Sequence, residues 1–167
     1  MVKNKPNAIY RTITVLQKIE DAILSGLLLV MIFMAVTQIF LRNLFDSGIL
    51  WADALIRVLV LWIGLIGAMI ASRDNHHISI DVISRYLPER TKQFTTFITS
   101  VFTALVCGIM SWFSLSFVLM EKLDGLTAFA AVPAWVCESI IPVSFAIICL
   151  RYLVMSVTLL ITIIKRS

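Results

Sequence analysis

Residues 51–81 read WADALIRVLV LWIGLIGAMI ASRDNHHISI D, and this stretch decides the fold class. No charged residue stands between Arg57 and Arg73. An α-helix rises about 1.5 Å per residue and a hydrocarbon core is about 30 Å thick, so one crossing needs about 20 residues. The uncharged run is shorter than this, and the crossing therefore includes the segment that begins at Trp51. We predict a transmembrane helix over residues 51–72.

The composition of the whole chain agrees with a membrane protein. Its 167 residues are 60% hydrophobic and 14% charged, and the mean hydropathy is +0.97. A soluble domain of this length would carry more charge. The net charge of +4 does not indicate nucleic-acid binding, because the basic residues form no patch with interleaved aromatics. They stand at the ends of apolar runs instead, as membrane anchors do.

Four apolar runs are long enough to cross a membrane, which predicts an all-α integral membrane protein. We find no internal repeat, and we expect a single four-helix membrane domain over residues 1–167. The predicted spans cover residues 22–41, 51–72, 93–120 and 135–164.

The segments between the spans are predicted as loops with one additional helix. Residues 42–50 form a short turn, and residues 121–133 form a second loop that turns at Asp124-Gly125. Residues 79–87 place their apolar side chains on one helical face, which is typical of a short amphipathic helix in the membrane interface. This helix is expected to end before Pro88, because the residue before a proline is disfavoured in α geometry.

Lysine and arginine are unequally divided between the two sides of the membrane. Ten of them fall in the amino-terminal segment, the connection between spans two and three, and the carboxyl-terminal tail, whereas the opposite side has only Arg42 and Lys122. Because cytoplasmic segments carry the excess of positive charge, we predict that both termini are cytoplasmic.

Few side chains suggest enzymatic or cofactor chemistry. His76 and His77 are adjacent, so on a helix they point about 100° apart and do not form the facing pair that a haem in a bundle needs. There is no third histidine, and Cys107, Cys137 and Cys149 form no C-x-x-C motif, which disfavours a zinc site or a thiol redox centre. We therefore expect no cofactor and no enzymatic activity.

Charged and small residues within the spans are the candidate contact residues. Asp53 and Arg57 have i,i+4 spacing with the acid first, which predicts an ion pair on one helical face. Arg151 lies within the fourth span, where an arginine costs at least about 2.5 kcal/mol and normally faces protein or water. We expect these charges to hold helices together rather than to bind substrate or ions. Two small-xxx-small pairs that permit close helix approach are Gly64 with Ala68 and Gly67 with Ala71.

Several short motifs follow one another along the chain. Arg42 ends the first span, and the second span contains Trp51, Asp53 and Arg57-x4-Trp62. Later motifs are Gly67-Ala68, Arg73, His77-Ile78-x-Ile80-Asp81, Val132-Pro133-Ala134-Trp135, Ile141-Pro142 and Arg151. In this order, over about residues 22–160, the chain resembles the small membrane subunit (DctQ-like) of tripartite ATP-independent periplasmic (TRAP) transporters. The family often has two consecutive acids after the tryptophan, whereas here Ala52 replaces the first.

The resemblance implies a multi-pass protein of the bacterial inner membrane. Such a subunit forms a heterodimer with a large membrane subunit, which moves an organic acid together with sodium by an elevator motion. It acts as a scaffold and helps to dock a periplasmic substrate-binding protein. The substrate would be sialic acid or a C4-dicarboxylate, and the chain resembles the sialic-acid members more. Membrane lipids are further expected partners, whereas nucleic acid is not. Contact or structural roles are then expected for Arg42, Trp51, Asp53, Arg57, Trp62, Gly64, Gly67, Ala68, Ala71, Arg73, His77, Asp81 and Arg151.

Two other classes of membrane protein remain as alternatives. A small four-span homodimeric exporter would need an essential acid within a span, but Glu20 and Asp21 precede the first predicted span. A membrane-anchored electron carrier would need histidines that project into the bundle. An absorbance spectrum tests the second alternative, and co-purification with a large hydrophobic partner tests the first.

The charge asymmetry generates a prediction about topology. A thiol reagent that cannot cross the membrane should label a cysteine placed at Ser47 or Gly125 in intact cells. A cysteine placed at Ser84 should be labelled only after the membrane is opened. Labelling at position 84 in intact cells would overturn the predicted orientation.

Overall fold

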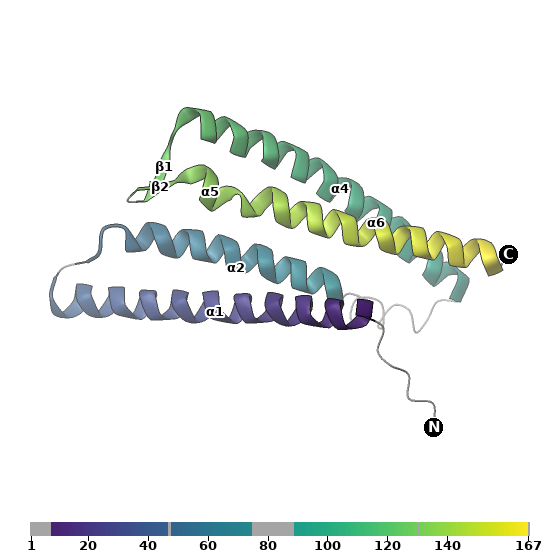
Figure 1. Ribbon diagram of the computed structural model, residues 1–167, viewed down its shortest axis with the longest axis horizontal. Helices are drawn as coiled ribbons and strands as arrows, with labels where there is room; N and C mark the ends of the chain where they lie inside the picture. The colour runs from purple at the N-terminus through teal and green to yellow at the C-terminus, as the bar shows by residue number, and fades with distance from the viewer. Residues whose placement is uncertain (1–7, 47, 75–88, 130, 167) are drawn as a thin grey trace, which may run out of the picture. The chain divides into compact units, whose positions relative to one another are not determined.

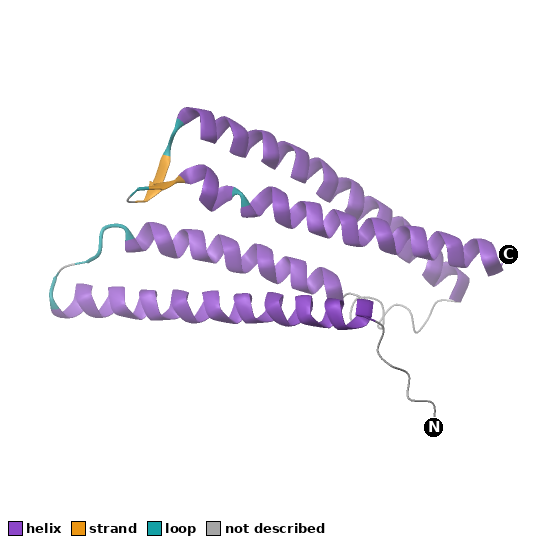
Figure 2. Ribbon diagram, viewed as in Figure 1, coloured by secondary structure: helices purple, strands orange, loops and turns teal. Residues whose placement is uncertain are grey.

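The computed structural model describes residues 8–46, 48–74, 89–129 and 131–166, and these are almost entirely helical (Figure 2). Four helical segments within them are long and apolar enough to cross a membrane, which confirms the predicted all-α membrane fold. They are Val15–Leu44, Ala52–Arg73, Gln93–Asp124 and Ala134–Ile161.

The chain groups into two compact units, Met1–Ile70 and Ala71–Ser167. The single-domain organisation stays a prediction, because this grouping does not test it. The predicted interfacial helix at 79–87, with His77 and Asp81, lies outside the described residues.

The first unit is built from α1 (Ala8–Leu44) and most of α2 (Ala52–Asp74), which run in opposite directions (Figure 1). α1 is longer than the predicted span 22–41, because no helix-breaking residue separates the polar amino-terminal segment from the apolar run. The helix ends at Leu44, and Asp46 adopts a left-handed conformation with φ 45°. A short polar side chain tolerates that conformation better than a branched apolar one would.

Gln38 fixes the connection between α1 and α2. Its side chain is only 9% exposed, although it lies in an apolar run. The Ile49 N–H donates to Gln38 Oε1 at 3.2 Å, and Gln38 Nε2 donates to the Ile49 carbonyl at 3.3 Å. Gly48 allows this approach, since a Cβ at that position would lie 3.1 Å from Gln38 Nε2. One side chain therefore satisfies both backbone groups of a residue in the connection.

The second unit contains α4 (Glu89–Asp124) and α6 (Ile140–Arg166), which pack along each other in opposite directions (Figure 1). Small side chains bring the two backbones close. A Cβ at Gly108 would lie 3.5 Å from Cys149 Sγ, and the Cys149 thiol donates to the Ala104 carbonyl at 3.2 Å. Ser111 Oγ donates to the Pro142 carbonyl at 3.1 Å. These contacts fix the register of α4 against α6.

The connection between α4 and α6 is more ordered than the predicted loop at 121–133. α4 continues to Asp124, and Gly125 then adopts a positive φ of 65°, with its N–H donating to the Glu121 carbonyl at 3.2 Å. Two short antiparallel strands follow, β1 (Thr127–Phe129) and β2 (Val132–Pro133).

The fourth predicted span, 135–164, is not one continuous helix. α5 (Ala134–Glu138) is separated from α6 by Ser139. Pro142 gives the physical reason, because proline has no N–H to donate to the carbonyl four residues earlier, which belongs to Glu138. The Ser139 N–H still bonds the Trp135 carbonyl at 3.0 Å, so the interruption is local.

The Gln38 contact generates a stability prediction. Gln38→Leu should keep the side-chain volume but leave the Ile49 N–H without its partner, at a cost of about 1–3 kcal/mol, whereas the Ile49 carbonyl still accepts from the Ala52 N–H. The readout is thermal unfolding of the purified protein in detergent. Thr37→Val is the matched control, because Thr37 bonds only the Phe33 carbonyl of its own helix at 2.8 Å. Equal stability of the two variants would contradict the assigned role of Gln38.

Candidate partner interface

The exposed residues of α2 form a single narrow line along the helix. They are spaced by three and four residues, so they share one face. We call this face the α2 stripe, and its members are Asp53, Arg57, Val60, Gly64, Ala68 and Ala71. Five of the six were predicted as contact residues from the sequence, and Val60 is the addition.

A second line on α2 is buried and has the complementary spacing. Ala52, Leu59, Ile66 and Met69 are each 8% exposed or less. α2 therefore has one face that this chain covers and one that it leaves open.

The carboxyl-terminal half of the α2 stripe is lined by small residues. Gly64, Ala68 and Ala71 are exposed, and a Cβ built at Gly64 or at the neighbouring Gly67 would meet nothing within 4 Å. Small side chains permit a second helix to approach its neighbour closely. This half of the stripe therefore carries little side-chain bulk.

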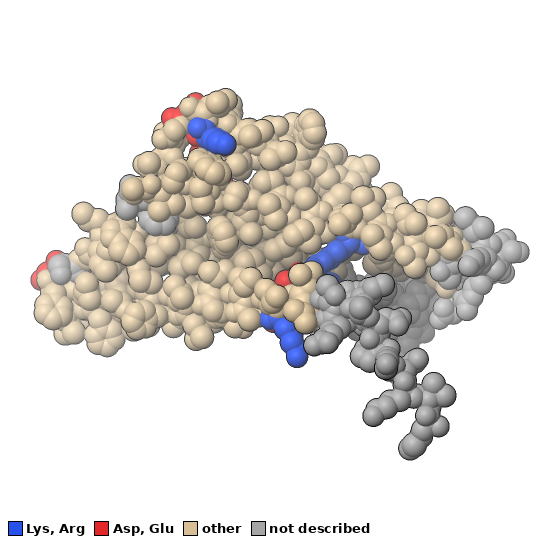
Figure 3. All heavy atoms as spheres, in the orientation of Figure 1, with Lys and Arg blue, Asp and Glu red and all other residues tan. Residues whose placement is uncertain are grey.

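Exposed faces of other helices differ from the α2 stripe in side-chain size. On α1 the exposed side chains include Leu29, Phe33 and Phe40, and on α4 they include Phe102 and Trp112. Large apolar side chains are suited to contact with lipid chains. Figure 3 shows how little charge the visible face carries in its described part. The α2 stripe is therefore the more specific candidate for a helix–helix contact.

The charged end of the α2 stripe is exposed. Asp53 lies in the first turn of α2, where an acid is favourable beside the helix N-terminus, and Arg57 follows one turn later. The ion pair predicted from their spacing stays a prediction. An exposed pair of this kind contributes only about 0.3–0.5 kcal/mol, whereas a partner that covered it would raise the cost of losing one member to about 3–5 kcal/mol.

The remaining predicted contact residues are dispersed. Arg42 is exposed in the last turn of α1, Trp51 is exposed just before α2, and Trp62 is half-buried within α2. Arg73 and Arg151 line one cavity in the second unit, where Arg151 Nη1 donates to Ser72 Oγ at 3.2 Å. The structure thus gives Arg151 a polar partner from α2, as expected for an arginine within a span.

Two acids that the sequence analysis did not single out meet at the β1–β2 end of the second unit. Glu138 lies next to Glu121, and the Oε2 atom of each is buried without a hydrogen-bond partner in the described part of the chain. Nearby, the Lys122 ammonium lies 5.1 Å from the centre of the Trp135 ring. The acid pair has no signal in the sequence, because the two residues are 17 positions apart and meet only through the packing of α5 against the end of α4.

Within the described residues, no group of three or more histidine, cysteine, aspartate or glutamate side chains is placed to hold a metal ion. The described polar side chains of the helices mostly bond their own helix. Ser25, Thr99, Ser100, Ser144 and Thr158, for example, donate to the carbonyl four residues earlier.

Together, four long apolar helices and an open small-residue face on α2 define a multi-pass membrane protein equipped for helix–helix contact. Comparison with protein families gives the particular class. The model for tripartite ATP-independent periplasmic transporters, DctQ component, matches residues 31–162. The chain belongs to this family and is a TRAP transporter small permease subunit.

Curated relatives agree with the family. The chain is 30% identical over 128 residues to the sialic acid TRAP transporter permease protein SiaT of Haemophilus influenzae strain 86-028NP. This alignment covers 71% of the chain and 20% of SiaT. A protein of Haemophilus influenzae strain Rd that is named as a TRAP transporter small permease is 28% identical over 75% of the chain and 84% of its own length. The C4-dicarboxylate small permease DctQ of Rhodobacter capsulatus is 27% identical over 64% of the chain and 47% of its own length. The chain thus spans about a fifth of SiaT.

The acid pair generates a prediction. Glu138→Gln should stabilise the protein by about 1–3 kcal/mol, because an amide removes the like charge and supplies N–H donors to the buried Glu121 oxygen. Thermal unfolding in detergent at neutral pH is the measurement. Asp124→Asn, which changes an exposed acid close to the pair, should shift stability by less than about 0.5 kcal/mol. A destabilised Glu138→Gln variant would show that both carboxylates are needed.

Proposed function

We propose that this chain is the non-transporting scaffold subunit of a sodium-coupled TRAP transporter and forms a heterodimer with a large permease subunit. The alignment with SiaT supports this division of labour. The matched region is 20% of that permease. We assign the unmatched part of SiaT to the proposed large subunit.

The proposed cargo is an organic acid, either sialic acid or a C4-dicarboxylate. The relatives whose names state a substrate include a sialic acid permease, a C4-dicarboxylate small permease and an isethionate permease. The higher identity to the sialic acid permease favours sialic acid. Coupling to sodium and the elevator motion belong to the proposed large subunit, and this chain is proposed to have no enzymatic activity.

The geometry of the described helices supports a role without a substrate site. Transport sites are typically built from helices broken near the bilayer midplane. α1, α2 and α4 are continuous along their described lengths, and the interruption at Ser139 lies five residues into the fourth candidate span. The described charges stand mainly near helix ends, where they suit docking.

The α2 stripe is the observation that carries the proposal of where the large subunit binds. Its small residues permit a helix of the partner to approach closely, and Asp53 with Arg57 would then be covered at the end of the contact. Assembly would raise the free-energy cost of removing Asp53 or Arg57 alone, because it would leave the other charge buried without its partner.

We further propose that the protein is a multi-pass inner-membrane protein with both termini in the cytoplasm, since lysine and arginine are concentrated on that side. The β1–β2 hairpin would then face the periplasm. This places it where a periplasmic substrate-binding protein could dock. Membrane lipids would surround the exposed apolar faces of α1 and α4.

The exporter and electron-carrier alternatives are not proposed. The family match covers all four candidate spans in part or in full and belongs to transporter components of the TRAP type. His76 and His77, on which the haem alternative depended, lie outside the described residues.

Reconstitution into vesicles tests the division of labour. The chain alone should move no sialic acid or C4-dicarboxylate above empty vesicles, and sodium-driven uptake should appear when a large permease subunit and a binding protein are added. Uptake by the isolated chain would overturn the scaffold role.

The same complex tests the α2 stripe. Ala68→Trp should lower the yield of intact complex after detergent extraction by about tenfold, because its bulk prevents a partner helix from approaching the small residues of the stripe. Ala22→Trp on α1 is the control, since it also enlarges an exposed alanine within a span. Equal yields for the two variants would show that the large subunit docks elsewhere.

A further inference from the structure

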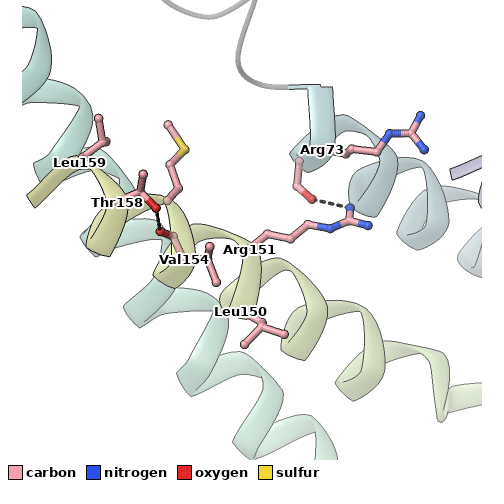
Figure 4. A pocket seen from close by; sticks show the side chains of 8 residues that line it. Arg73, Leu150, Arg151, Val154, Thr158 and Leu159 are labelled. Carbon is pink, nitrogen blue, oxygen red and sulfur yellow. Dashed lines mark hydrogen bonds between the residues drawn. The ribbon is translucent and has the colours of Figure 1, made fainter. Parts of the chain in front are cut away.

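A cavity of about 420 Å³ lies within the second unit, beside the carboxyl-terminal end of α2. Its volume falls in the range of small-molecule sites, about 300–1,000 Å³. Figure 4 shows Arg73 and Arg151 at one end and a row of α6 side chains along the other. The lining includes Ser72, Arg73, Leu150, Arg151, Val154 and Leu159.

The positive charge of the cavity is held near the edge of the membrane. Arg73 is the last residue of the candidate span Ala52–Arg73, so it lies where the hydrocarbon region ends. The backbone of Arg151 is ten residues inside the end of its own span at Ile161, about 15 Å along the helix. Its side chain nevertheless reaches Ser72 Oγ at 3.2 Å (Figure 4, dashed), and long basic side chains extend to the interface in this way.

This placement puts two permanently charged guanidinium groups at the depth of lipid phosphates. Arginine stays protonated and presents planar N–H donors that match phosphate oxygens. Among the described residues that line the cavity none is acidic. The charge of the cavity therefore favours an anion.

The rest of the lining is apolar and continuous with the lipid-facing surface. Leu150 and Val154 are 63% and 61% exposed on α6. Thr158 is polar, but its hydroxyl donates to the Val154 carbonyl at 2.8 Å within the same helix. A free phosphate or a small organic anion would gain nothing from this wall, whereas an acyl chain would bury apolar surface against it.

We propose that this cavity binds one anionic phospholipid, with its phosphodiester at Arg73 and Arg151 and an acyl chain along Leu150 and Val154. Basic cavities between helices at a membrane surface are suited to anionic headgroups. The site uses residues of this chain alone and does not depend on the proposed transport function.

Native mass spectrometry of the purified protein in detergent tests the site with dioleoyl phosphatidylglycerol, dioleoyl phosphatidylcholine and inorganic phosphate as separate probes. We expect one retained phosphatidylglycerol, with phosphatidylcholine binding at least tenfold more weakly and phosphate not retained. Equal retention of the two lipids would overturn the proposal, as would phosphate competing with phosphatidylglycerol at matched ionic strength.

Variants separate the cavity from the rest of the surface. Arg73→Gln and Arg151→Gln should each weaken phosphatidylglycerol binding about fivefold, the effect of one basic residue near a membrane surface. Val154→Trp, which fills the cavity and keeps both charges, should also weaken it. Lys18→Gln is the matched control, because it removes an exposed basic residue of α1 that does not line the cavity, and this variant should bind normally. Normal binding by both Val154→Trp and Arg73→Gln would overturn the proposal even if Arg151→Gln fails to fold.

Discussion

Close backbone approach between α4 and α6 is the interaction on which the second unit depends. In a bilayer the hydrophobic effect does not drive helices together, so dispersion contacts and hydrogen bonds must do so. Gly108, Ala104 and Ser111 on α4 leave room for Cys149 and Pro142 on α6, and two side-chain-to-carbonyl bonds connect the helices there. Larger residues at these positions would separate the backbones and remove both bonds.

The same logic explains the difference between the two faces of α2. Its buried line is made of ordinary apolar residues, whereas its exposed line is mostly small or charged. A helix face that contacts only lipid chains requires neither small nor charged residues. This difference is the reason for proposing that a partner helix covers the open face.

Span number and order were predictable because a hydrocarbon core demands long uncharged runs, and such runs are visible in sequence. Helix ends are harder to predict than spans. α1 extends well beyond the span expected at 22–41, because a helix can leave the membrane without a break. Pro142 indicates that the fourth helix is interrupted. The interruption lies at Ser139, next to Glu138, whose carbonyl lacks the N–H that a residue other than proline would donate.

Contacts between distant residues could not be predicted. Gln38 looked like an isolated polar residue, and only the path of the connection reveals that it binds Ile49. Nothing in the sequence indicates that Glu121 and Glu138 are neighbours, or that Arg151 reaches Ser72, 79 positions away. Periodicity identifies faces of helices, whereas these pairs depend on the register of one segment against another.

The grouping into two compact units bears on how the protein is made. α1 and nearly all of α2 belong to the first unit, and the connection between them is secured by Gln38 within that unit. These internal bonds require no residue beyond Ile70, so they can form during translation, before the ribosome has completed the rest of the chain. A nascent helical hairpin with its connection already satisfied exposes fewer unpaired backbone groups to the translocon and to quality-control proteases.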